Sequence, residues 1–154
     1  MSAAETGLSL TGHYDTGFDQ WGLGGGVTQT LLSPFARVSV DVRYFRRPNA
    51  DERLNRAANL DVQYIPYRSS NSVFYALVGA ELSLSDLPET EDNLSDDIPT
   101  RGTLIRLGVN FGLGAERRLS RTISFFGQAK YVRTPDFEKN RVSLTGGLRV
   151  YVSE

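Results

Sequence analysis

The feature of this sequence that most constrains its fold is an alternation of apolar and polar residues that recurs in eight separate segments. A period of two is typical of β-strands whose faces meet different environments, because successive side chains point to opposite sides. Helical spacing is hard to find anywhere in the chain. We therefore predict an all-β protein with strands at residues 7–14, 20–31, 36–46, 56–66, 73–84, 103–114, 122–133 and 141–152.

The two faces of these strands differ in chemistry. One face carries aliphatic, aromatic and glycine residues, with Gln29 as its only clearly polar member and no charged residue. The opposite face carries small, polar and charged residues. The apolar exceptions on this polar face are Phe45, Ile65, Tyr75, Leu77 and Phe126.

Length and composition exclude several classes of protein. The 154 residues suit one domain, and we expect residues 1–5 to form a disordered N-terminus before a single domain at 6–154. The chain has no cysteine and one histidine, His13, which excludes disulfides, thiolate metal sites and multi-histidine metal centres. A net charge of −1 gives no electrostatic reason to expect a nucleic-acid partner.

The connectors between the predicted strands alternate between longer and shorter segments. The first, third, fifth and seventh connectors include the longest and most acidic one, residues 85–101, whereas the second, fourth and sixth are short turns. This pattern fits an up-and-down antiparallel sheet with two different ends. Eight such strands can close into a barrel, which removes the exposed sheet edges.

Alternation alone does not say which face points inward, but the aromatic residues of the apolar face fall into two groups. They are Tyr14, Trp21, Tyr44 and Tyr131 toward the long-connector end, and Tyr64, Phe74, Phe111 and Phe125 toward the short-turn end. Two aromatic girdles that flank an apolar band are typical of barrels that cross a membrane. The polar face is rich in Gly, Ser and Thr, which suits a narrow interior better than a hydrated exterior. We therefore predict an eight-stranded antiparallel up-and-down transmembrane β-barrel.

The charged residues of the polar face would then meet inside the barrel. They are Arg37, Asp41, Arg43, Asp61, Glu81, Arg106, Lys130 and Arg149. A buried charge is costly unless it is paired and hydrogen-bonded. Because cations outnumber anions in this set, we expect incomplete pairing that water or the barrel mouths complete. We interpret the set as a structural plug, since the interior of an eight-stranded barrel fills with side chains; an ion or proton path is the alternative.

A resemblance to a known group of proteins rests on this architecture and on the end of the sequence. That end reads Gly127-Gln128-Ala129-Lys130-Tyr131, a loop, and then Ser143-Leu144-Thr145-Gly146-Gly147-Leu148-Arg149-Val150-Tyr151-Val152. The chain resembles the small eight-stranded bacterial outer-membrane barrels, which include the transmembrane domain of outer-membrane protein A and the opacity-type surface proteins. The resemblance implies an outer-membrane location after removal of a signal peptide, contact with membrane lipid and lipopolysaccharide, and insertion by the barrel-assembly machinery.

Candidate chemistry is sparse. His13 lies on the polar face without a catalytic partner beside it, so an enzymatic role such as lipid modification is not expected. The acidic segment 86–97 lacks the spacing of a calcium loop, and we expect neither metal nor cofactor. Arg117, Arg118 and Arg121 fall in a predicted short turn, where they either contact anionic lipid head groups or are ordinary turn residues.

The sequence thus predicts a non-enzymatic outer-membrane barrel that acts as a membrane-anchored scaffold or as a surface-interaction protein through its extracellular loops. An envelope or extracellular protein partner is expected at the loop 85–101. The alternatives are a small ion or solute pore, and a soluble carrier-type barrel, natural or engineered, with its apolar face inside. Fold alone does not choose among these functions.

Overall fold

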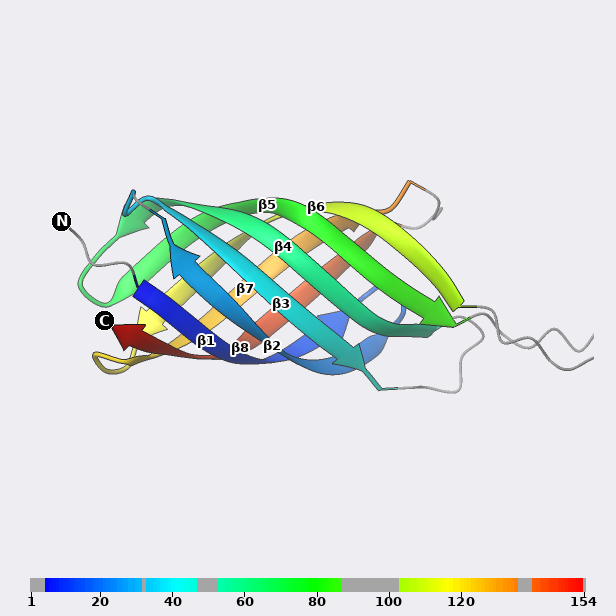
Figure 1. The fold of residues 1–154 in the computed structure, drawn as a ribbon, viewed down its shortest axis with the longest axis horizontal. Helices are drawn as coiled ribbons and strands as arrows, with labels where there is room; N and C mark the ends of the chain where they lie inside the picture. Colours follow the sequence, from blue (N-terminus) through cyan, green and yellow to red (C-terminus); the bar gives the residue numbers. More distant parts are fainter. Residues whose placement is uncertain (1–4, 32, 47–52, 87–102, 136–139, 154) are drawn as a thin grey trace, which may run out of the picture.

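The computed structural model describes residues 5–31, 33–46, 53–86, 103–135 and 140–153, and in them each of the eight predicted segments forms a β-strand (Figure 1). The strands are β1 (Glu5–Asp15), β2 (Gln20–Thr30), β3 (Ala36–Phe45), β4 (Arg53–Arg68), β5 (Ser72–Asp86), β6 (Thr103–Arg118), β7 (Ile123–Arg133) and β8 (Arg141–Ser153). The described residues contain no helix that could span a membrane.

Every strand pairs antiparallel with its neighbours in sequence, and β8 pairs with β1, so the sheet is a closed barrel. The register fixes the tilt of the strands. If one starts at Thr6 and steps from each residue to its partner on the next strand, one circuit of the barrel ends at Thr16. The residues on the way are Gln29, Val38, Val62, Val78, Phe111, Tyr131 and Val142, so the register shifts by ten residues per circuit. A shift of this size in an eight-stranded barrel corresponds to strands tilted by roughly 35–45°. Figure 1 shows the strands running obliquely to the long axis of the barrel.

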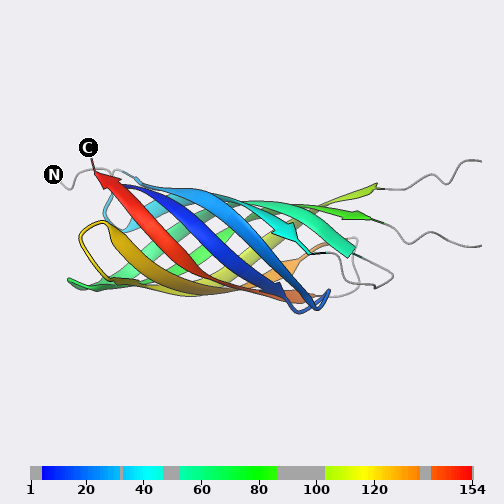
Figure 2. The same cartoon turned by 90° about the horizontal axis from the view of Figure 1, so that it is seen from below.

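The two ends of the barrel differ. The turns between β2 and β3, β4 and β5, and β6 and β7 lie at one end, where β1 also begins and β8 ends; we call this the short-turn end. At the opposite, long-connector end, β5 and β6 extend beyond the other strands (Figure 2). We call the side toward the short-turn end lower and the side toward the long-connector end upper.

The apolar face of every strand points outward. Leu10, Leu23 and Leu113 are about 70% exposed, whereas Arg37, Glu81 and Lys130 are at most 1% exposed inside the barrel. The barrel therefore has the reverse of the arrangement in a water-soluble protein, because apolar side chains cover its outer surface and charged side chains fill its interior. This orientation agrees with the predicted transmembrane barrel and contradicts the alternative of a carrier with an apolar interior.

The apolar residues on the inner face gather near the two ends. At the short-turn end Ile65, Val73, Tyr75 and Leu77 form one small cluster, and at the other end Phe45, Leu54 and Ala57 form a second, against which Phe18 packs. These clusters account for four of the five apolar exceptions in the sequence pattern. The fifth, Phe126, lies beneath the guanidinium of Arg149, 4.3 Å from its ring centroid.

Some predicted boundaries were wrong. β4 and β6 run further toward the short-turn end than predicted, so Arg117 and Arg118 lie in a strand and the turn contains only residues 119–122. Glu5 already belongs to β1, and Ser85 belongs to β5. The rest of the predicted disordered N-terminus, residues 1–4, and residues 87–101 of the predicted interaction loop lie outside the described residues.

The outward orientation predicts a position-dependent penalty for charge. Val40→Arg, near the middle of the outer face of β3, should lower the free energy of unfolding in lipid vesicles by about 2–4 kcal/mol, because the guanidinium enters hydrocarbon. Leu31→Arg, directly after the lower end of β2, is the matched control and should cost only about 0–1 kcal/mol. Urea titration in phospholipid vesicles measures both values, and an equal or absent cost at the two positions would contradict the orientation.

Candidate functional site

The interior of the barrel holds a continuous series of side chains with alternating charge, which we call the upper ionic array. It begins near mid-height and ends at the long-connector mouth. Its members, in order of contact, are Asp61, Lys130, Asp41, Arg43, Glu81, Arg141 and Asp15. These residues come from β1, β3, β4, β5, β7 and β8, so the array links strands that are not neighbours in the sheet.

The lower half of the array centres on Lys130. Its ammonium group donates to Asp61, and both side chains are fully buried; it also lies 3.6 Å from Asp41 Oδ2. Arg43 Nε donates to Asp41 Oδ1 at 2.7 Å. A cation of β7 is therefore held between carboxylates of β3 and β4, across the width of the barrel.

The upper half of the array continues through Arg43 to the mouth. Arg43 Nη1 lies 3.6 Å from Glu81 Oε2 and donates to Ser143 Oγ at 2.9 Å. Glu81 in turn accepts a hydrogen bond from Arg141, whose Nη1 donates to Asp15 Oδ2 at 2.6 Å. The charges alternate in sign along the whole array, which is the arrangement that makes burial of ions tolerable.

A second group, the lower ionic cluster, surrounds Glu116 near the short-turn end. Arg37 and Arg149 donate to Glu116 Oε2 at 2.9 and 2.5 Å, and Glu116 Oε1 accepts from Tyr151 and Ser124. The guanidinium of Arg37 also stacks 4.8 Å from the ring centroid of Tyr75. One carboxylate thus holds two buried cations together with four charge-assisted hydrogen bonds.

The structure places every charged residue of the predicted interior set on the inner face, with Arg106 half-buried on β6. Sequence reasoning missed Glu116, Asp15 and Arg141. With these three added, the set contains six cations and five anions, so the excess of cations falls from two to one. Parity could have found Glu116, because this residue continues the series of inward-facing positions on β6. It was missed because the strand was predicted to end at residue 114.

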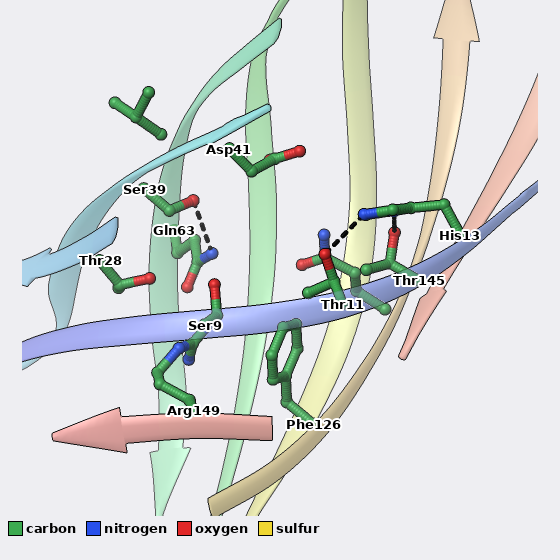
Figure 3. Close-up of a pocket in the computed structure, with 12 residues that line it drawn as sticks. Ser9, Thr11, His13, Thr28, Ser39, Asp41, Gln63, Phe126, Thr145 and Arg149 are labelled. Atoms are coloured by element: carbon green, nitrogen blue, oxygen red, sulfur yellow. Dashed lines mark hydrogen bonds between the residues drawn. The ribbon is translucent and has the colours of Figure 1, made fainter. Parts of the chain in front are cut away.

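His13 is buried beside the upper ionic array, near Arg43, Asp41 and Lys130. Its Nε2 lies 2.6 Å from Thr11 Oγ1 and its Nδ1 lies 2.9 Å from Thr145 Oγ1 (Figure 3). The cavity beside it has a volume of about 20 Å³ and is lined by polar side chains that include Asp41 and Gln63. Such a volume holds about one water molecule, so a substrate has no room at this histidine.

Inward-facing glycines make space for the bulky interior residues. A Cβ added to Gly24 would lie 2.7 Å from His13 Nε2, and one added to Gly114 would overlap the ring of Tyr75. These glycines are therefore required by packing.

The outer aromatic residues largely follow the predicted two-level pattern. Tyr14 and Trp21 are cross-strand partners near the long-connector end, with ring centroids 4.7 Å apart. Phe74 contacts Tyr67 near the short-turn end, at 5.8 Å, and Tyr67 was not predicted. Phe111 was assigned to the wrong level: it pairs with Tyr131, at 5.0 Å, and belongs with the upper group. The error arose because β6 extends four residues beyond its predicted end.

Comparison with known proteins identifies the fold but no family. No protein-family model and no curated protein matches the sequence. Solved structures do match over almost the whole chain. The N-terminal β-barrel domain of OprF from Pseudomonas aeruginosa is 14% identical, with a TM-score of 0.66 over 96% of this chain and 97% of that one.

Two further similar structures belong to other bacteria. Ail, the attachment invasion locus protein of Yersinia pestis, is 9% identical, with a TM-score of 0.61 over 97% of each chain. Neisserial surface protein A is 12% identical, with a TM-score of 0.61 over 96% of this chain and 94% of that one. The chain therefore has the fold of the small eight-stranded outer-membrane β-barrels, and its apolar outer surface supports the predicted location in an outer membrane.

The geometry of the lower ionic cluster predicts a large cost for removing one charge. Glu116→Gln should lower the free energy of unfolding by about 3–5 kcal/mol, because two buried guanidinium groups lose their counter-charge. Glu5→Gln is the matched control: Glu5 pairs with Arg118, both side chains are about 30% exposed, and the expected cost is below about 1 kcal/mol. Denaturant titration of the detergent-solubilised barrel compares the two, and equal costs would contradict the assigned role of Glu116.

Proposed function

We propose that this protein is a non-enzymatic outer-membrane barrel that works as a rigid membrane anchor for its long connectors. The observation that carries the proposal is the interior: buried ion pairs link opposite walls at two levels, and the cavity between them holds about one water molecule. A barrel filled in this way supplies stiffness and position to what it displays, while it leaves little space for transport.

The arrangement around His13 argues against catalysis. The histidine is 1% exposed, and its two ring nitrogens already contact threonine hydroxyls. A general base needs access to a substrate proton, and the adjacent cavity admits none. Its role in this proposal is to fill the interior and to orient Thr11 and Thr145.

Specific interactions are proposed for the outside of the barrel. The apolar band contacts membrane lipid, with lipopolysaccharide as the lipid of the outer leaflet, and the barrel-assembly machinery inserts the chain. The connector at 85–101 is the proposed binding segment for an envelope or extracellular protein, since it is the longest and most acidic one. The strands on either side of it support this proposal, since β5 ends and β6 begins at the long-connector end.

Topology gives the first test of this proposal. Trypsin added to intact cells should cut after Arg101, its single target in residues 85–101, and should leave the turn after Arg121 uncut because that turn faces the periplasm. Permeabilised cells are the control, in which both sites become accessible to the protease. The reverse pattern in intact cells would invert the proposed topology.

Conductance tests the closed interior against the pore alternative. Purified protein reconstituted in planar lipid bilayers should show no discrete channels, because the ion pairs of the upper array and the lower cluster cross the lumen. Reproducible single-channel steps from pure protein would favour the pore. A variant with Glu116→Gln and Arg149→Gln should remain closed, because the upper array is intact.

A further inference from the structure

A trough of small residues crosses the lipid-facing surface of four neighbouring strands. Its floor consists of four residues that are cross-strand partners in succession on β6, β7, β8 and β1: Ala115, Gly127, Gly146 and Gly12. Phe74 on β5 closes one end, and Leu23 on β2 closes the other. At a strand spacing of about 4.8 Å the floor is roughly 15–20 Å long.

Larger side chains flank the floor on both sides, except at Ala129. The upper wall is the row Leu113, Ala129, Leu144 and Tyr14, and the lower wall is the row Arg117, Phe125, Leu148 and Leu10. The part of this surface around Ala115, Gly127 and Ala129 is an open hollow of about 520 Å³. The hollow follows from the pairing register, since the small residues of separate strands meet in one line.

The barrel itself does not require glycine on this floor. A Cβ added to Gly12, Gly127 or Gly146 would find no atom closer than 3.9 Å outside its own chain neighbours. The inward glycines are the opposite case, as Gly24 shows. Glycine weakens a strand by about 0.5–1 kcal/mol relative to alanine. Three glycines in one line, where the barrel has room for a Cβ, therefore indicate that a molecule outside the chain uses the space above them.

A cation lies where the trough approaches the short-turn end. Arg117 is two residues below Ala115 on the same face of β6, pairs with Phe125 and is exposed. Within the part of the chain that the structure describes, Arg117 forms no ion pair, whereas its neighbour Arg118 is bound to Glu5. Arg121, in the adjoining turn, is exposed as well. A basic side chain at this level meets lipid head groups.

We propose that the trough is a binding site for one anionic phospholipid of the leaflet at the short-turn end, with an acyl chain along the Ala115–Gly12 floor and the phosphate at Arg117. The apolar floor and walls match a hydrocarbon chain, and the cation matches the charge of the head group. A second copy of this protein fits less well. A two-fold axis along the membrane normal would bring its Arg117 to the same level, where like charges repel.

Native mass spectrometry of the delipidated, folded barrel in detergent tests this proposal. Wild-type protein should bind phosphatidylglycerol more tightly than phosphatidylcholine with the same acyl chains. Arg117→Gln should weaken phosphatidylglycerol binding about fivefold and weaken phosphatidylcholine binding less, because the choline cation offsets the charge of its phosphate. The double variant Gly127→Leu, Gly146→Leu fills the floor and should weaken the binding of both lipids.

Matched controls separate this site from general contact with lipid. Arg133→Gln removes an exposed arginine at the upper end of β7, and Ala80→Leu enlarges an outward residue of β5; both should bind as the wild type does. Inorganic phosphate should not displace the lipid, and displacement would overturn the site as a lipid site.

Two further results would also overturn it. One is that Arg117→Gln and the double variant Gly127→Leu, Gly146→Leu bind both lipids as tightly as the wild type does. The other is that the wild-type protein forms a dimer and the double variant does not. The inference rests on the proposed membrane role. A folded barrel that binds phosphatidylglycerol no more tightly than phosphatidylcholine would refute the trough site but not that role.

Discussion

Closure of the backbone hydrogen-bond ladder is the constraint on which the rest of this structure depends. In hydrocarbon every backbone N–H and C=O must find a partner in the protein, and a sheet achieves this only when its first and last strands pair. Here β1 and β8 pair from Glu5 and Ser153 at one end to Asp15 and Ser143 at the other. That pairing, with its ten-residue shift around the barrel, sets the tilt of the strands and the width of the interior.

The narrow interior determines which side chains can occupy it. Cations at the centre of the barrel have no bulk water to solvate them, so they are placed against carboxylates from other strands, as with Lys130 and Asp61. The same side chains that satisfy each other's charge also occupy the lumen. Stability of the interior and the proposed closure of the lumen therefore have one physical cause, and a variant that opens the lumen should also be less stable.

Much of the barrel architecture was predictable from the sequence, because an alternation with a period of two shows directly which side chains share a face of a strand. The strand number, and the placement of residues such as Arg43 and Asp61 on the face opposite the apolar one, follow from parity alone. That the apolar face points outward needed a second signal, the two levels of aromatic residues and the small residues of the polar face. Strand ends do not, because polar residues at the barrel rim look like turn residues; the early end predicted for β6 hid Glu116 and misplaced Phe111. The trough was invisible for a different reason: whether Gly12, Gly127 and Gly146 meet depends on register, which alternation within one strand does not contain.

The central claim is that the apolar face meets lipid while the charges face the axis, and the single tryptophan of the chain, Trp21, tests it most directly. Trp21 is 69% exposed on the outer face, in the upper aromatic group. In vesicles of brominated phosphatidylcholine its fluorescence should be quenched most strongly by bromine atoms near the glycerol end of the acyl chain, and aqueous iodide should quench it weakly. Strong quenching by iodide without quenching by the brominated lipids would contradict the account.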